Sequence, residues 1–347
     1  MIHRILLTTV LLLSASPFLS GQRLLEPREL HERVAQGIDL ILRQEYVRAD
    51  SIFKEVTIRY PESPAGYLFR IAVLQSKALD YEEILEQYEL ESLLDQAQKQ
   101  IDEILRRDPR DAWGHYFAGT LHIYDSFARV QRGDWFGGVT KGLSAVSSFR
   151  NALEYDSALT DSYAGIGTYL YWKSKRTEFL HWLPFVSDDR EEGIQYLRRC
   201  ALRGEYNKYV AINSLIIVFL EEGKYEEANR YADTVLGLYP RNRSFLWGKA
   251  TALDRMGNPE RAAGAYKRLL NEILSDSAEN RYNELVCRLN LSKNLLHLGK
   301  LDETMEHLKV VSAMSLNSFK RHLRSRAKPK IEEAQALLRN RQKSSSH

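Results

Sequence analysis

The chain has 347 residues, of which 44% are hydrophobic and 27% are charged, and its formal net charge is +3. This length is enough to bury a sizeable core, and the composition is not that of a disordered chain. The small net charge excludes nucleic-acid binding driven by bulk electrostatic attraction, so we expect no nucleic acid among the partners.

The first residues form a separate segment. Arg4 precedes the apolar run "ILLTTVLLL", residues 5–13, which is followed by the small and polar run "SASPFLSGQ". This pattern is typical of an export signal, and its apolar part is short for a permanent membrane span. We expect residues 1–21 to be a signal peptide removed after Gly21, with cleavage after Ser16 or an uncleaved membrane anchor as alternatives. The mature protein is then periplasmic or secreted.

A triplet of small and apolar residues recurs along the chain with the spacing i, i+4, i+7. The first four copies are 48 residues apart and the next steps are 35 and 34 residues; the copies begin at Ala49, Ala97, Ala145, Gly193, Ala228 and Ala262, and a looser one begins at Thr304. This spacing puts each triplet on one face of a helix, with a small residue where a neighbouring helix comes close. We therefore predict a series of helix hairpins in which each triplet marks the second helix.

One of these units carries a resemblance to a known family. The segment "EEGKYEEANRYADTVLGLYPRN", Glu221 to Asn242, resembles the second half of a tetratricopeptide repeat in its Gly-x-Tyr-x-x-Ala run, the apolar residue four places on and the closing proline. The resemblance is strong over residues 209–275 and weaker, but in register, over 30–208 and 281–317. It implies an all-α fold, a right-handed superhelical solenoid of helix hairpins whose first units are enlarged to 48 residues.

The domain organisation follows from the same register. We expect the helical repeat array to span residues 30–317, and residues 318–347 to form a C-terminal capping helix and a disordered tail, "QKSSSH". Pro329 suits the first turn of that helix. The basic run from Lys320 to Lys330 is interpreted as a solvated basic face, with an anionic lipid or nucleic-acid contact as the alternative.

The family resemblance also implies a concave face, lined by the first helices, that binds peptides or partner helices. Aromatic side chains suit such a face because they supply large contact area with few rotors to freeze. The alternative is that several of them fill the seam between repeats. The register puts the following residues on or near that face: Trp113, Tyr116, Tyr124, Tyr171, Trp172, Asn213, Trp247, Arg255 and Lys293.

The extra residues of each long unit fall between its two helices, at roughly 79–92, 127–139 and 175–188. Aromatic residues recur there almost one repeat length apart, Trp135 and Phe136 in the second insertion and Phe179, Trp182 and Phe185 in the third. In a solenoid such insertions emerge along one edge. We expect these side chains to pack on each other as a satellite core. A partner-binding patch and a membrane-surface contact are the alternatives.

No motif indicates catalysis. The sequence lacks a phosphate-binding loop, a serine elbow, a paired-cysteine metal motif and HExxH, and His115, His122 and Asp125 are interpreted as core or surface residues. We expect no catalytic residue, no metal and no cofactor. Cys200 and Cys287 fall in different repeats, so we expect two buried free thiols, with a disulfide as the alternative.

Together these patterns predict a non-catalytic scaffold or adaptor in the cell envelope. It binds a protein or peptide through the concave groove or through the inserted aromatic edge. A peripheral membrane-associated assembly component is the alternative function, and an enzyme has less support.

Overall fold

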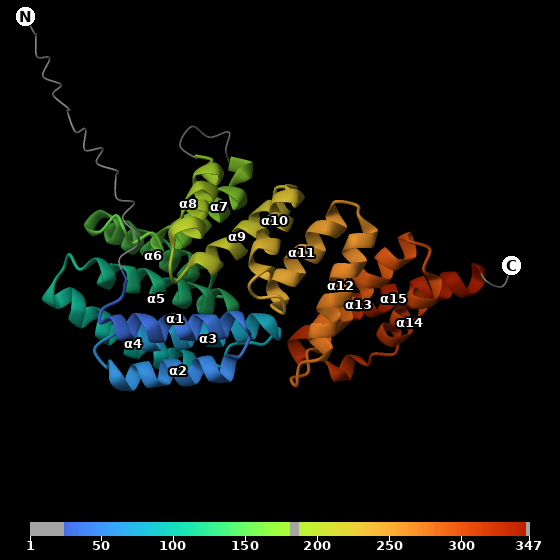
Figure 1. Ribbon diagram of the computed structural model, residues 1–347, viewed down its shortest axis with the longest axis horizontal. Helices are drawn as coiled ribbons and strands as arrows, with labels where there is room; N and C mark the ends of the chain where they lie inside the picture. Colours follow the sequence, from blue (N-terminus) through green and yellow to red (C-terminus); the bar gives the residue numbers. More distant parts are fainter. Residues whose placement is uncertain (1–23, 181–186, 345–347) are drawn as a thin grey trace, which may run out of the picture.

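The computed structural model describes residues 24–180 and 187–344, and α-helices joined by short connections dominate both ranges (Figure 1). Neither range contains a β-strand. The predicted all-α fold, a solenoid of helix hairpins, is confirmed. The helices are α1 (Arg28–Leu42), α2 (Tyr46–Arg59), α3 (Ala65–Asp80), α4 (Gln87–Arg107), α5 (Ala112–Gln131), α6 (Trp135–Tyr155), α7 (Ser162–Arg176), α8 (Arg190–Arg203), α9 (Lys208–Glu221), α10 (Tyr225–Leu236), α11 (Arg243–Arg255), α12 (Pro259–Leu274), α13 (Arg281–His297), α14 (Leu301–Ser312) and α15 (Arg324–Ser344).

Consecutive helices pair as hairpins, and the first helices of successive hairpins also touch one another. Helix α1 contacts α3, α3 contacts α5, and the series continues through α7 and α9 to α11. Units of a curved array lie closest together on its inner side. The odd-numbered helices α1 to α11 therefore form the inner layer and the even-numbered helices form the outer layer.

The recurring triplet lies on the second helix of each hairpin, as predicted. All three members are buried in each even-numbered helix except α4, where Ile104 is half-buried. The small residue has a direct steric reason in α8, because a Cβ atom at Gly193 would lie 2.7 Å from the carbonyl oxygen of Gly167 in α7. The backbones of α7 and α8 pack so closely that this crossing admits only glycine without a shift of one helix.

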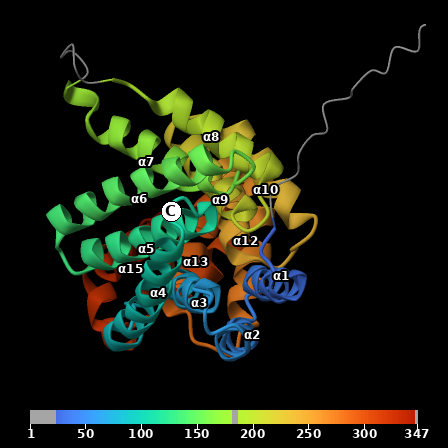
Figure 2. The same ribbon diagram turned by 90° about the vertical axis from the view of Figure 1, so that its left-hand side faces the viewer.

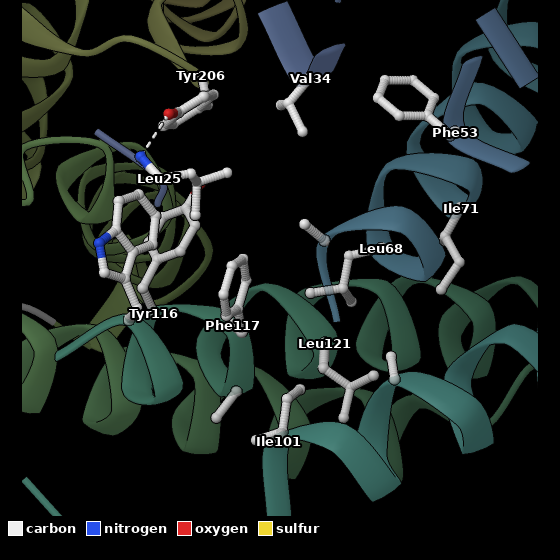
Figure 3. Packing of buried hydrophobic residues seen from close by; sticks show 14 of the residues in the cluster. Leu25, Val34, Phe53, Leu68, Ile71, Ile101, Tyr116, Phe117, Leu121 and Tyr206 are labelled. Atoms are coloured by element: carbon white, nitrogen blue, oxygen red, sulfur yellow. Dashed lines mark hydrogen bonds between the residues drawn. The ribbon is translucent and has the colours of Figure 1, made fainter. Parts of the chain in front are cut away.

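The hydrophobic core follows the solenoid in three clusters. The first is built mainly from α1 to α5, the second mainly from α7 to α13, and the third from α13 to α15. Figure 3 shows part of the first cluster, with Leu68 and Phe117 from different hairpins facing one another. The backbone N–H of Leu25 donates to the hydroxyl of Tyr206 over 3.0 Å, which ties the start of the described chain to the connection between α8 and α9.

The solenoid curves until its first coil meets a later one. The C-terminal ends of α1 and α3 point toward α11 to α13 (Figure 1), and Figure 2 views the coils along the long axis. The side chain of Asn242 donates to the carbonyl oxygen of Leu42 over 2.8 Å, and the Tyr239 hydroxyl donates to Asp39 over 3.0 Å. Leu42 itself packs in the second core cluster. We call the meeting of residues 39–46 and 80–83 with residues 239–243, 276–283 and 320–326 the coil contact.

The three insertions take different forms. The first forms the connection 81–86 and the first turns of α4, which has 21 residues, and the second prolongs α5 and α6 to 20 and 21 residues. The third begins with the short 3-10 turn Glu178–Leu180. Trp182 and Phe185 lie outside the described residues, so their expected packing stays a prediction.

The expected satellite core is wrong for the described aromatic residues. Trp135, Phe136 and Phe179 are 58%, 85% and 74% exposed. Trp135 and Phe136 open the first turn of α6, directly after Asp134, whose side chain accepts from the N–H of Gly137. They stand at the tip of the α5–α6 hairpin, beyond the part of the helix that its neighbours cover.

The C-terminal helix differs from the expectation in two details. Pro329 lies inside α15 instead of in its first turn, and the helix continues to Ser344, so residues 342–344 of the expected disordered tail are helical. Helix α15 packs on α13 and α14 and so covers the end of the array. Its basic run is partly engaged in the coil contact, since Arg326 pairs with Glu82 over 2.7 Å and Lys320 pairs with Glu83 over 2.6 Å.

Candidate partner-binding groove

A half-open cavity of about 300 Å³ lies on the inner layer, beside the coil contact. Helices α1, α3, α5, α9 and α11 supply most of its wall, so both coils contribute to it. We call this cavity the interior groove. Its wall consists of Ile38, Ile41, Leu42, Gln44, Tyr46, Phe69, Ala72, Gln75, Ser76, Leu79, Tyr124, Tyr206, Asn207, Tyr209, Val210, Asn213, Asn242, Ser244 and Phe245.

The wall of the interior groove is mainly apolar and carries no charged side chain among the described residues. Val210 on α9 and Leu79 on α3 expose 55% and 60% of their surface, and Ile217 continues the apolar stripe of α9 two turns further on. Among the described residues of the wall, none is Lys, Arg, Asp or Glu. Apolar side chains that stay exposed in a concavity are typical of a binding site, because a ligand gains free energy by removing them from water.

The polar groups of the wall fall into two classes. The amides of Gln44, Asn207 and Asn242 already hydrogen-bond to other residues of the protein. Gln75 and Asn213 make no side-chain hydrogen bond within the described part of the chain. Each carries two N–H donors and a carbonyl acceptor. These two amides are therefore available to a ligand.

Two tyrosines of the wall, Tyr124 and Tyr206, stay neutral. Burial raises the pKa of the Tyr124 hydroxyl above its usual range, and burial likewise raises the pKa of Tyr206. A raised pKa keeps the phenol protonated at neutral pH, so neither hydroxyl brings a negative charge into the groove. The Tyr206 hydroxyl is used internally, because it accepts from the N–H of Leu25 and lies 2.8 Å from Nδ1 of His31.

The charges at the border of the groove are held in a buried network at the coil contact. Arg243 of α11 bonds to Asp80 at the end of α3, with Nε to Oδ1 at 2.9 Å, and its Nη1 lies 2.7 Å from Asp276. The side chains of Arg243 and Asp80 are 8% and 3% exposed. Tyr46 and Gln44 also donate to Asp80, over 2.9 and 3.0 Å. The network joins segments about 160 to 200 residues apart in sequence.

The amides of Asn280 and Asn283 complete this network. Each donates to the backbone carbonyl of Asp80 over 2.8 Å, which satisfies the end of α3. Burial raises the pKa of Tyr46 and Tyr81 far above the usual tyrosine value, so both phenols remain donors to carboxylates. One buried cation between two carboxylates, with neutral donors around it, holds the two coils together.

Acid is expected to weaken the coil contact through Asp276. Burial raises the pKa of this carboxyl, but hydrogen bonds from the Ala278 N–H and the Tyr81 hydroxyl, together with the charge of Arg243, outweigh burial and hold the pKa below the ordinary 3.8. A carboxyl whose folded pKa is depressed stabilises the fold above its unfolded pKa and loses that contribution as the pH falls through the folded value. The free energy of unfolding should therefore fall below about pH 4.

Urea unfolding at pH 7, 5 and 3 tests this sign. The Asp276→Asn variant should be less stable than wild type at pH 7 and should lose less stability on acidification. Parallel pH profiles for the two proteins would contradict the assignment.

The described residues form no metal site, disulfide or membrane-spanning helix. In ranges 24–180 and 187–344, no three His, Cys, Asp or Glu side chains gather in an arrangement that would hold a metal ion. Cys200 and Cys287 are buried free thiols, and burial raises the pKa of both, Cys200 also through the charge of Asp161. Of the helices in these ranges, none has the length and apolarity needed to cross a membrane.

Comparison with known protein families identifies the repeats in one part of the chain. Residues 214–278, which run from within α9 to just beyond α12, match the family model described as tetratricopeptide repeat. This segment of the chain therefore consists of tetratricopeptide repeats. The match includes the end of α9 and the whole of α11, and α11 contributes Ser244 and Phe245 to the groove wall. No curated protein sequence matches the chain.

Solved structures similar to this tetratricopeptide-repeat protein have low sequence identity to it. Cut9–Hcn1, a hetero-tetramer of APC/C, is 14% identical with a TM-score of 0.51, and the match covers 82% of this chain and 46% of that chain. PilW, described as a type IV pilus biogenesis factor, is 16% identical over 74% of this chain and 97% of that chain, with a TM-score of 0.48. Yeast Tom70 is 13% identical over 91% and 66%, with a TM-score of 0.45. At 14% identity the likeness to Cut9–Hcn1 shows the fold alone.

Three of the nine residues expected on the concave face of this tetratricopeptide-repeat protein are core residues instead. Trp113, Tyr116 and Tyr171 are buried, with 9%, 3% and 0% of their surface exposed. Trp113 and Tyr116 pack edge to face with ring centres 5.2 Å apart in the first core cluster. The Tyr171 hydroxyl donates to Glu222 over 2.8 Å. These side chains fill the seam between hairpins, and the prediction that they face a ligand is corrected.

The other six expected residues are at least partly accessible but lie at different places. Tyr124 and Asn213 are in the wall of the interior groove. Trp247 lines a separate cavity of about 350 Å³ with Arg326 and Lys330. Arg255 is exposed at the end of α11, and Trp172 packs edge to face on Tyr171. Lys293 pairs with Glu333 of α15 over 2.7 Å, so the capping helix engages its charge.

The main groove residues missed by the sequence analysis are Val210, Leu79 and Gln75. A signal was present for Val210, because "YVAINSLIIVFL" is apolar on nearly every side of its helix and leaves apolar residues over after the core face is filled. Leu79 lies at the end of α3, and the sequence gives only a rough boundary between this helix and the insertion that follows it. Gln75 is neither apolar nor charged, so no pattern in the sequence singles it out.

Proposed function

We propose that this tetratricopeptide-repeat protein is a non-catalytic scaffold or adaptor of the cell envelope that holds a polypeptide segment of a partner in the interior groove. A single observation carries the proposal: a half-open, uncharged cavity on the inner layer pairs exposed Val210 and Leu79 with the free amides of Gln75 and Asn213. Exposed apolar surface between free hydrogen-bonding groups suits a peptide better than it suits a reaction, since the described wall residues include no Cys, His, Lys, Asp or Glu that could activate a hydroxyl. The export signal read in residues 1–21 supports the envelope location.

The inserted edge supports a second candidate function. Trp135, Phe136 and Val139 form an exposed apolar stripe on the first turns of α6, and Phe179 is exposed on the neighbouring insertion. Such a surface suits a second partner or the interface of a membrane, as in a peripheral envelope assembly component. The two candidates use different residues, Val210 in the groove wall and Val139 on the inserted edge, so one pair of variants separates them.

The test is recovery of partners from a native envelope extract by the tagged mature protein and by two matched variants. Val210→Asp places a charge in the groove, and Val139→Asp places the same charge on the inserted edge. The two valines are 55% and 56% exposed on helices, so the substitutions should disturb folding equally little.

The proposal predicts that a specific partner is recovered by wild type and by Val139→Asp, and that Val210→Asp recovers about tenfold less. Loss confined to Val139→Asp would move the binding site to the inserted edge. Equal recovery by all three proteins would refute the groove as the site. Circular dichroism spectra of each variant serve as the control for retained helix content.

A further inference from the structure

We infer that the interior groove selects an extended, uncharged segment that inserts one aliphatic or aromatic side chain between α3 and α9 and hydrogen-bonds through its backbone to Gln75 and Asn213. This inference rests on the proposed function and specifies the chemistry of the partner. It follows from the charge, the size and the free polar groups of the groove, taken in turn.

The charge of the wall excludes a charged anchor. A Lys or Asp side chain that enters the groove loses hydration and meets no opposite charge among the described wall residues. The cation and carboxylates of the adjoining coil contact are committed to each other, Arg243 to Asp80 and Asp276. Arg43, at the border of the wall, is likewise paired with Asp39 over 2.7 Å. A ligand charge would therefore displace an existing pair.

The size of the groove fits one anchor side chain with its flanking backbone. Its volume of about 300 Å³ lies at the lower end of the range of ligand pockets, roughly 300–1,000 Å³. Val210 and Leu79 supply the exposed apolar surface that this anchor covers. Phe69 and Phe245 add aromatic wall, which favours a Leu or Phe anchor over a small residue.

The free amides indicate an extended segment. Gln75 and Asn213 can each donate to a backbone carbonyl and accept from a backbone N–H, whatever the sequence of the ligand. A helical ligand has already paired these backbone groups with each other, whereas an extended one presents them unpaired. Two free amides beside an apolar pocket therefore suit an extended ligand that offers an unpaired backbone N–H, an unpaired backbone carbonyl and one apolar side chain.

The experiment uses four capped peptides, Ac-Ser-Gln-Xaa-Gln-Ser-NH2, with Leu, Phe, Lys or Asp at the central position. Binding to the full mature protein is measured by saturation-transfer NMR titration, which detects weak complexes. We expect the Leu and Phe peptides to bind about tenfold more tightly than the Lys and Asp peptides. Asn213→Ala should weaken the Leu peptide about five- to tenfold through the lost backbone hydrogen bonds.

The matched valine variants make the test specific to the groove. Val210→Asp should shift the preference from the Leu peptide to the Lys peptide, and Val139→Asp should leave the wild-type order unchanged. Equal affinities for the four peptides, no detectable binding of any of them, or a Leu preference that survives Val210→Asp would each overturn the inference.

Failure here differs from failure of the proposed function. If partner recovery depends on Val210 while the peptides show no preference, the groove is the binding site but its ligand is not an extended apolar segment. If recovery does not depend on Val210, the proposed function itself is wrong.

Discussion

Replacing Arg243 by alanine is expected to lower the free energy of unfolding by about 3–5 kcal/mol. The substitution leaves Asp80 almost fully buried without its cation. It also removes the only positive charge described between the carboxylates of Asp80 and Asp276, both of which pair with Arg243. Removing one member of a buried ion pair is strongly destabilising because the remaining charge keeps its desolvation penalty and loses its partner. The coil contact should open in this variant, and the groove wall that it holds should separate.

Arg241 provides the matched control two residues away. Its guanidinium pairs with Glu272 over 2.7 Å but is 73% exposed, so Arg241→Ala should cost less than about 1 kcal/mol. Urea unfolding followed by circular dichroism measures both variants. Equal destabilisation by the two substitutions would contradict the assignment of Arg243 as the centre of a buried network.

Replacing Tyr171 by alanine is the second substitution with a large expected effect, again about 3–5 kcal/mol of unfolding free energy. Tyr171 is fully buried in the second core cluster, where its ring packs against Trp172, and the variant leaves a cavity that its neighbours cannot fill. Tyr171→Phe removes only the hydrogen bond to Glu222 and should cost about 0.5–1.5 kcal/mol.

Thermal and urea unfolding of the two Tyr171 variants test its place in the core against the concave face expected from the sequence. If Tyr171 is a core residue, Tyr171→Ala is destabilised more than Tyr171→Phe. Each variant then recovers less partner only in proportion to the fraction of the protein that is unfolded. If Tyr171→Ala unfolded like wild type and failed to bind the partner, Tyr171 would be a ligand-contacting residue and the packing described above would be wrong.

The hairpin series was predictable from the sequence because it depends on local periodicity. The triplets, of which the first begins at Ala49 and the last at Thr304, indicate which face of each second helix is buried. Every unit keeps this three-residue pattern. The close approach at Gly193 follows from the same pattern, since the small residue marks where the paired helix lies.

The coil contact was not predictable, because it depends on the accumulated curvature of the whole array. Asp80 and Arg243 belong to different repeats, and nothing in either local sequence announces the other. A buried Asp at the end of α3 looks like an ordinary surface residue of a helix end until the second coil covers it. The engagement of Arg326 and Lys320 was missed for the same reason.

The candidate site was predicted only in part because the family register does not fix the angle of each first helix in the long units. Tyr124 and Tyr171 both occur at helical spacing, yet one lies in the groove wall and the other in the core. The 20-residue helix α5 extends beyond an ordinary repeat, so a residue near its end faces a different neighbour from one near its start. Asn213 lies in the groove wall, one residue before the segment that matches the family, and its role in binding stays a prediction.

The most direct test of the central claim is hydrogen–deuterium exchange of the protein with and without its recovered partner. A segment seated in the interior groove should slow amide exchange in residues 38–46, 69–79 and 206–217, which form the walls on both coils. Exchange in residues 127–143, at the inserted edge, should stay unchanged. Protection confined to residues 127–143, with the groove helices exchanging as in the free protein, would contradict the account.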